Sequence, residues 1–246
     1  MIREKLIAKN VGLDKNFRLR GTDVSRVEAF SDAVFGFAVT LVVVSLDIPT
    51  NFTQLRSTLI NGFISFAICF AMIVAVWYSH YKYFRRYGLA DAFTIFLNMV
   101  MLFVILIYIY PLKFLFNLLT NPTFSQSGAN SAIENQQWPQ LMVIYGVGFV
   151  AIYTVFLLLH VHAYRNRLKL ELNEAELHVT TSSILSTLLV ICVGLASILI
   201  ATFGGVQGVD WSGWIYLCIV PIHIISGRVV PVMRKARQNR QAAKTE

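Results

Sequence analysis

The chain has 246 residues, of which 56% are hydrophobic and only 14% are charged, and its mean hydropathy is +0.62. Because a soluble domain carries roughly 25% charged residues, this composition excludes a typical soluble enzyme or binding domain and indicates a membrane protein. The formal net charge of +8 would suggest a nucleic-acid partner in a soluble protein, so its meaning depends on where the basic residues lie.

Six apolar segments are long enough to cross a hydrocarbon core of about 30 Å, which takes about 20 helical residues. In chain order they are Val27–Ile48, Leu59–His80, Ala92–Leu115, Leu141–Tyr164, Ser182–Phe203 and Trp211–Val232. We therefore predict an all-α membrane protein with six transmembrane helices per subunit, folded as a single domain over residues 1–246.

The basic residues fall almost entirely on one side of these predicted spans. Of the 21 Lys and Arg, all but Arg56 and Lys113 lie in the N-terminal tail, in the connections after the second and fourth spans, or at the C-terminal end. The positive-inside rule then places both termini in the cytoplasm. We expect cytoplasmic basic tails at residues 1–25 and 234–246, an external loop at residues 120–139, and no nucleic-acid partner, since topology accounts for the charge.

The first predicted span opens with a charged motif, whose residues are Arg26, Phe30, Ser31 and Asp32. A carboxylate inside a membrane helix is energetically costly, so it needs a partner or a function. At 3.6 residues per turn, Asp32 lies nearly opposite an apolar stripe. The stripe consists of Phe30, Phe37, Leu41, Val44 and Ile48, begins in line with Arg26, and has Thr40 beside it. Such a stripe usually faces lipid or another helix, and the residues alone leave open whether it has a further function.

The second predicted span ends with Trp77 and His80, at the same predicted depth as Asp32. Indole and imidazole both carry N–H groups that can satisfy a buried carboxylate. Each residue by itself is ordinary at a membrane interface. Together with Arg26 they predict a structural polar cluster around Asp32 that orients the first helix.

The chain resembles the transmembrane protein 175 family, which comprises the lysosomal potassium channel of animals and its prokaryotic relatives. The positions that carry the resemblance are Arg26, Phe30, Ser31, Asp32, Trp77 and His80. Asn98 early in the third span and Pro111 near its outer end agree with it. The motif occurs once, as in the single-repeat prokaryotic form, which assembles as a homotetramer with the first helix of each subunit lining a central four-fold pore.

The resemblance implies a potassium-permeable cation channel in a prokaryotic plasma membrane, surrounded by lipid, with K⁺ as the permeant ion and no cofactor. In that family, bulky apolar side chains of the first helix form a constriction, and the matching positions are Phe37, Leu41 and Val44. Thr40 occupies the place of a hydroxyl credited with potassium selectivity. Position 37 departs from the family, which more usually has isoleucine or leucine there. The structural network of the family is carried over to Arg26, Phe30, Ser31, Asp32, Trp77 and His80.

Potassium over sodium selectivity is expected to be modest, because the chain lacks the TVGYG-type carbonyl filter of ordinary potassium channels. No metal-ligand spacing, nucleophile elbow or paired-carboxylate site occurs, so we expect no enzymatic activity and no bound metal. An alternative from another class is a proton-coupled secondary transporter in which Asp32 and His80 titrate. A carrier needs Asp32 to face a cavity, whereas a channel needs it packed away from the stripe of Phe37, and helix geometry favours the channel.

Overall fold

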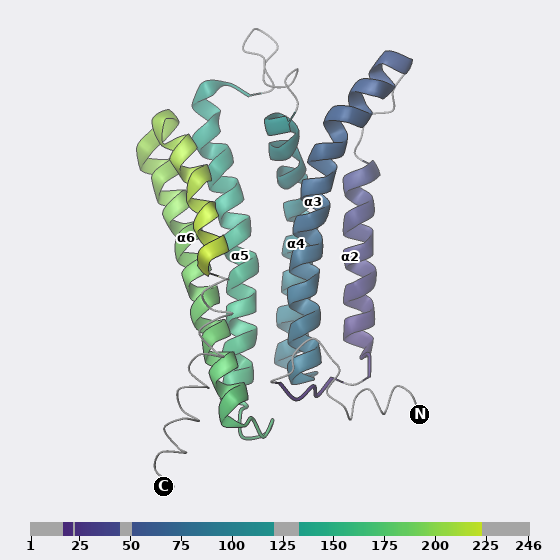
Figure 1. The fold of residues 1–246 in the computed structure, drawn as a ribbon, viewed down its shortest axis with the longest axis vertical. Coiled ribbons are helices and arrows are strands. Elements are labelled where there is room, and N and C mark those ends of the chain that lie inside the picture. Colours follow the sequence, from purple (N-terminus) through teal and green to yellow (C-terminus); the bar gives the residue numbers. More distant parts are fainter. Residues whose placement is uncertain (1–16, 22, 45–50, 121–132, 223–246) are drawn as a thin grey trace, which may run out of the picture.

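The computed structural model describes residues 17–21, 23–44, 51–120 and 133–222. Its helices stand side by side along one long axis, with α2 at one side of the bundle and α6 at the other (Figure 1). The α-helices are α2 (Arg26–Val44), α3 (Phe52–Tyr87), α4 (Ala92–Thr120), α5 (Trp138–Arg165) and α6 (Glu174–Trp214). There are also two short 3₁₀ helices: η1 (Asn135–Gln137) precedes α5, and η2 (Ile215–Cys218) follows α6.

Four helical stretches of the described residues are long and apolar enough to cross a membrane, which agrees with the predicted all-α membrane class. They are Gly62–Tyr87, Ala92–Leu119, Asn135–Arg165 and Glu174–Ile222. The helix α2 is not among them, and its first two turns carry three charged side chains. The predicted count of six helices is not reproduced, because the described residues contain five α-helices.

The difference in helix count arises within α6, which holds the predicted fifth span and the beginning of the sixth. Gly205 lies outside the helical conformation, with φ 54° and ψ −143°, a backbone region that is open to glycine at little steric cost. Beyond Gly205 the chain folds back on itself. This is shown by the Ser197 hydroxyl, which donates to the Ser212 carbonyl at 2.8 Å. A Cβ atom on Gly208 would lie 2.6 Å from the carbonyl oxygen of Ile200. The helix is therefore a hairpin with one ascending and one returning arm (Figure 1).

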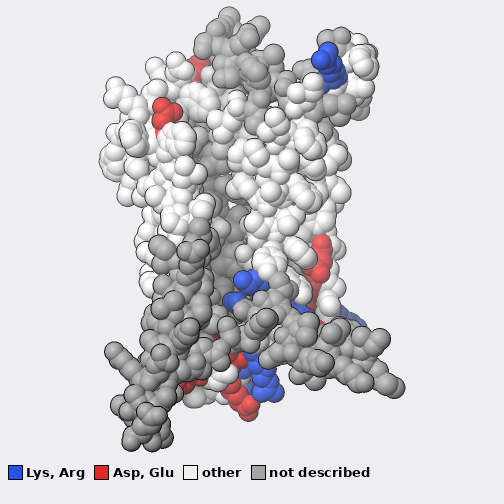
Figure 2. Space-filling view, in the orientation of Figure 1, with Lys and Arg blue, Asp and Glu red and all other residues white. Residues whose placement is uncertain are grey.

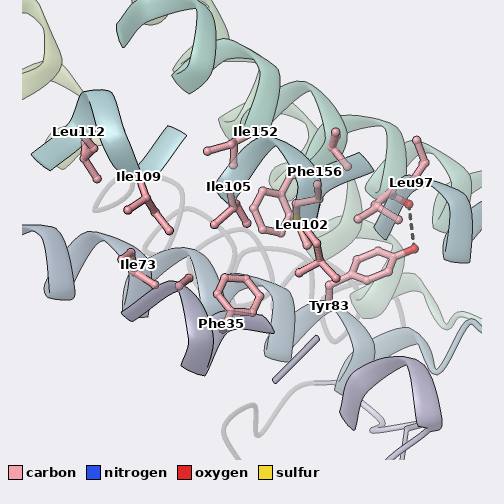
Figure 3. Packing of buried hydrophobic residues seen from close by; sticks show 14 of the residues in the cluster. Phe35, Ile73, Tyr83, Leu97, Leu102, Ile105, Ile109, Leu112, Ile152 and Phe156 are labelled. Atoms are coloured by element: carbon pink, nitrogen blue, oxygen red, sulfur yellow. Dashed lines mark hydrogen bonds between the residues drawn. The ribbon is translucent and has the colours of Figure 1, made fainter. Parts of the chain in front are cut away.

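Buried apolar side chains from α2, α3, α4 and α5 form one continuous core (Figure 3). Figure 3 shows Phe35 of α2 beside α3, and Ile105 of α4 among side chains from the neighbouring helices. The buried Tyr83 hydroxyl crosses from α3 to α5, where it donates to the Leu159 carbonyl at 3.1 Å. The helices pack in an order close to that of the chain: α2 contacts α3 and α4, α4 contacts α5, and α6 packs chiefly on α5.

Charged side chains gather near the end of the bundle at which α2 begins, while the wall above that end is largely uncharged (Figure 2). We call this the basal end; it comprises residues 17–25, the α3–α4 connection and the α5–α6 connection. Of the regions predicted outside the spans, the first tail is described from residue 17. The loop at 120–139 is described again from residue 133, where η1 leads into α5. The tail at 234–246 lies outside the described residues.

Candidate functional site

The helix α2 buries one face against its neighbours and leaves the other uncovered. The buried face repeats at intervals of four, three and four residues, the period of an α-helix; its members are Ser31, Phe35, Ala38 and Val42. On the other side, Phe30 is 53% exposed and Phe37 is 57% exposed, and Thr40 is exposed as well.

The side chains at the predicted constriction positions differ in their exposure. Phe37 is fully on the uncovered face. Leu41 is half-buried and packs against the core, while the side chain of Val44 lies outside the described part of the structure. Thr40 donates its hydroxyl proton to the Phe37 carbonyl at 2.7 Å. The hydroxyl oxygen keeps acceptor capacity on the exposed side, because only its donor is used.

A buried hydrogen-bond chain ties α2 to α3 and α4. The Ser31 hydroxyl donates to the Val27 carbonyl at 2.8 Å and accepts from the Asn98 amide nitrogen at 2.9 Å. The Asn98 oxygen accepts from Nε2 of His80, also at 2.9 Å. Ser31, Asn98 and His80 are each at most 1% exposed. An unsatisfied polar group at such a depth costs about 1–3 kcal/mol, so the three side chains hold α2 in one rotational setting.

Asp32 has a different partner set from the one that the sequence pattern predicted. Trp77 donates its indole N–H to the Asp32 carboxylate at 2.8 Å, on the exposed side of α2 and α3. His80 is bonded to Asn98 instead of Asp32. Among the described residues, Arg26 is exposed at the start of α2 and makes no hydrogen bond with Asp32. The predicted cluster is therefore divided into an exposed Asp32–Trp77 pair and a buried chain.

Two further residues at this site were not assigned a contact by the sequence pattern. Asn98 was noted only for the resemblance, although a lone amide within an apolar span is itself a signal of a buried polar contact. The charge pattern sets Lys113 apart from the basic regions of the predicted cytoplasmic side, but it is 6% exposed and its ammonium group donates to the Val42 carbonyl at 2.9 Å. That carbonyl belongs to the last turn of α2, where acceptors lack helical partners and a cation is favourable.

The positions of Asp32 and His80 also bear on the alternative of a proton-coupled transporter. Asp32 is exposed whereas His80 is enclosed by the rings of Phe35 and Phe84, so the two groups face different surroundings. Among the described residues, no cluster of three or more His, Cys, Asp or Glu side chains is arranged to hold a metal ion. The arrangement can hold a helix in place and present one apolar face with a hydroxyl.

Residues 26–111, from the start of α2 into α4, match the profile of the family described as the endosomal/lysosomal potassium channel TMEM175. A potassium channel of Marivirga tractuosa is 41% identical over 238 residues, which cover 92% of this chain and 95% of that protein. A potassium channel of Chamaesiphon minutus is 28% identical over 108 residues, covering 41% of this chain and 53% of that protein.

Solved structures give the same result. The crystal structure of a variant of the potassium channel MtTMEM175, in complex with a nanobody fusion protein, superposes with a TM-score of 0.78 at 40% identity and covers 89% of this chain and 99% of its own. A lysosomal potassium-selective channel TMEM175 homolog from Chamaesiphon minutus shares the fold, with a TM-score of 0.54 at 22% identity over 82% of this chain and 96% of its own. With this similarity along nearly the whole chain, the protein is a prokaryotic member of the TMEM175 potassium-channel family.

Proposed function

We propose that this protein is a potassium-permeable cation channel in which α2 lines a central pore formed by four copies of the chain. The observation that carries the proposal is the uncovered face of α2 with Phe37 and Thr40 upon it. The relatives from Marivirga tractuosa and Chamaesiphon minutus are named potassium channels, which supports the same function.

The position of α2 in the bundle suits a pore on a symmetry axis. It stands at one side of the bundle (Figure 1) and packs on α3 and α4, so its other face is available to equivalent helices of neighbouring subunits. A rotational axis needs only one such helix from each copy. The exposed side of α3 carries an apolar groove in which Ala67, Ala71 and Ala75 recur at every fourth residue, and small residues permit close helix contact in membranes.

The roles along α2 follow from what each side chain presents. A ring of four Phe37 side chains would close the pore by steric contact and dewetting, as apolar constrictions do. Leu41 and Val44 complete the constriction toward the other end of the helix. The Thr40 hydroxyl, with its proton held by the Phe37 carbonyl, offers an oxygen to a partly dehydrated cation. Selectivity for K⁺ over Na⁺ by this means is modest, and no cofactor takes part.

The orientation in the membrane follows from charge. The basal end holds the described basic clusters of the α3 end and the α5–α6 connection (Figure 2), and the positive-inside rule places such an end in the cytoplasm. Both termini are then cytoplasmic, in a prokaryotic plasma membrane. The returning arm of α6 corresponds to the beginning of the predicted sixth span, and the whole chain is one transmembrane domain in contact with lipid.

Potassium flux from reconstituted vesicles tests the proposal through Phe37→Ala. Removing the largest side chain of the constriction should raise the rate of K⁺ efflux several-fold. Phe203→Ala is the matched control, because Phe203 is 85% exposed on α6 and lies away from the proposed pore; it should leave the rate unchanged. Equal rates in both variants and the wild-type protein would contradict a pore at α2.

Two further measurements separate this function from a carrier and test the assembly. A carrier that uses Asp32 would move protons with its substrate, so Asp32→Asn would abolish proton-coupled flux while Phe37→Ala had no effect. The mass of the purified complex in nanodiscs should correspond to four chains. A monomer that still conducts would refute the shared pore.

A further inference from the structure

The residues just before α2 are held firmly across the basal end of the bundle. We call residues 17–21 the basal strap; Figure 1 shows it as the dark purple segment beneath α3 and α4. Phe17 is 1% exposed and packs edge-on against Tyr87 of α3, with ring centroids 5.4 Å apart. Arg85 of α3 donates to the Gly21 carbonyl at 2.6 Å. A Cβ at Gly21 would lie 2.5 Å from the carbonyl oxygen of Phe84, so only glycine permits this approach.

The far side of the strap is bound to the start of α6. Arg20 forms a two-pronged pair with Glu176, in which Nη2 donates to Oε2 at 2.8 Å and Nη1 to Oε1 at 3.1 Å. The Arg18 backbone N–H donates to the same carboxylate at 2.7 Å. Arg20 also donates to the carbonyls of Leu170 and Glu171 in the α5–α6 connection. Bidentate contacts between guanidinium and carboxylate are strong and fix geometry.

Glu176 is also part of the N-terminal cap of α6. Its carboxylate accepts from the Asn173 backbone N–H at 3.0 Å, while its own N–H donates to the Asn173 side chain at 2.9 Å. Four N–H donors therefore meet on one carboxylate that is 1% exposed, which uses its full acceptor capacity. Removing one member of such a buried pair leaves the other charge uncompensated, so the strap and the first turn of α6 are bound as one unit.

The strap is also close to the proposed pore helix along the chain. Arg26, the first residue of α2, follows Gly21 by five residues, which span about 17 Å at most when extended. Within the bundle, α2 packs on α3 and α4 whereas α6 packs chiefly on α5. The strap thus gives α6 a short connection to the beginning of α2 that does not pass through the helix interfaces.

We propose that Arg20 and Glu176 are positioning residues through which the first turn of α6 sets the basal end of the pore helix, and thereby the fraction of time the pore is open. The inference rests on the channel function proposed above. Because neither residue lies on the pore face of α2, loss of their contact changes opening without changing the ions that pass.

Single-channel recording in planar bilayers tests this with Glu176→Gln, which weakens the pair at nearly constant volume. We expect the open probability to change at least three-fold, with the unitary K⁺ conductance and the K⁺/Na⁺ reversal potential unchanged. Arg20→Gln should give the same change, and the double variant should give no more than either alone. Arg20→Lys keeps the positive charge but loses the two-pronged contact of the guanidinium group, so its effect on the open probability should be intermediate. If Glu176→Gln does not assemble, Arg20→Lys takes its place in the test.

The matched control is Glu171→Gln, which removes the same charge from a neighbouring residue. Its ion pair with Arg18 is long, at 4.0 Å, and both side chains are open to solvent at 74% and 81%. The open probability should stay within about 1.5-fold of wild type, because an exposed ion pair contributes little free energy. An unchanged open probability in Glu176→Gln, or a change in its conductance or reversal potential, overturns the inference.

Hydrogen exchange keeps the inference testable apart from conduction. The backbone amides of residues 29–33, the first that are hydrogen-bonded within α2, should exchange at least ten-fold faster in Glu176→Gln than in Glu171→Gln, whether or not the protein conducts. Equal exchange would overturn the positioning role. A wild-type protein that gives no K⁺ current would refute the proposed function instead, which distinguishes the two failures.

Discussion

Replacing Asn98 by alanine removes both buried hydrogen bonds that this side chain forms, one with Ser31 of α2 and one with His80 of α3. Ser31 still donates to the Val27 carbonyl, so its hydroxyl proton keeps an acceptor. The Nε2–H of His80 loses its acceptor in a side chain that is 1% exposed. The main cost of Asn98→Ala is therefore one orphaned donor and the loss of two contacts between helices.

The magnitude follows from these two terms. An orphaned buried donor costs about 1–3 kcal/mol, and interhelical hydrogen bonds in membrane proteins are worth on average about 0.6 kcal/mol, with a maximum near 1.7 kcal/mol. We expect Asn98→Ala to lower the free energy of unfolding by about 1–3 kcal/mol. Reversible unfolding in detergent micelles, followed by circular dichroism, measures this difference.

The control for this experiment is Asn135→Ala, because Asn135 is an exposed residue of η1. Surface substitutions of this kind usually stay within about 0.5 kcal/mol of wild type. The double variant Ser31→Ala/Asn98→Ala should be less destabilised than the sum of its single variants, since both remove the same contact. Asn98→Ala and Asn135→Ala with equal stability would refute the buried chain as the element that holds α2.

Three other outcomes are expected. Thr40→Ala should bring the permeabilities of K⁺ and Na⁺ closer together, measured as the reversal potential, because the exposed hydroxyl is lost. Lys113→Met should lower the free energy of unfolding by about 1 kcal/mol, since the last turn of α2 loses its cation. Burial opposes the ionised form of Asp91, but hydrogen bonds from Thr94 and His162 hold the pKa of its carboxyl below the ordinary value. Its contribution to stability is present above the unfolded pKa of about 3.9 and is lost as pH falls through the folded pKa. The stability advantage of wild type over Asp91→Asn should therefore shrink as the pH falls below about 5.

Each of these has a clear contrary result. An unchanged reversal potential in Thr40→Ala would remove the hydroxyl from the selectivity argument. Lys113→Met with wild-type stability would mean that the cation contributes nothing at the end of α2. A pH-independent difference between wild type and Asp91→Asn would contradict the lowered pKa of this carboxyl.

Hydrophobic length was sufficient to predict most helices. The predicted third span and α4 both begin at Ala92, and α5 begins three residues before the predicted fourth span. This works because every backbone N–H and C=O in a membrane needs an internal partner, so a long apolar run forms a helix in any context. The predicted fifth span ends at Phe203 and the predicted sixth begins at Trp211, on either side of Gly205, whereas the structure has both positions within α6.

Side-chain partners were harder to predict, as His80 and Lys113 illustrate. His80 was assigned to Asp32, yet Asn98, 18 residues further along the chain, is its partner. The charge pattern assigns Lys113 no partner, whereas the structure buries it against α2. The capping pattern of Asn173 and Glu176 could be read locally, but the contact of Glu176 with Arg20 joins residues 156 positions apart.

The amino-acid sequence by itself therefore determined the membrane class, most of the helix positions, the family and the helix that bears the charged motif. Hydropathy, charge and motif are properties of each segment taken alone, so they can be read from the sequence without knowing which helices pack against that segment. Only the tertiary structure decided that Ser31 faces inward while Phe37 faces outward, and which polar groups meet. These contacts depend on how each helix is rotated about its own axis, and that rotation is set by the packing of side chains from several helices at once.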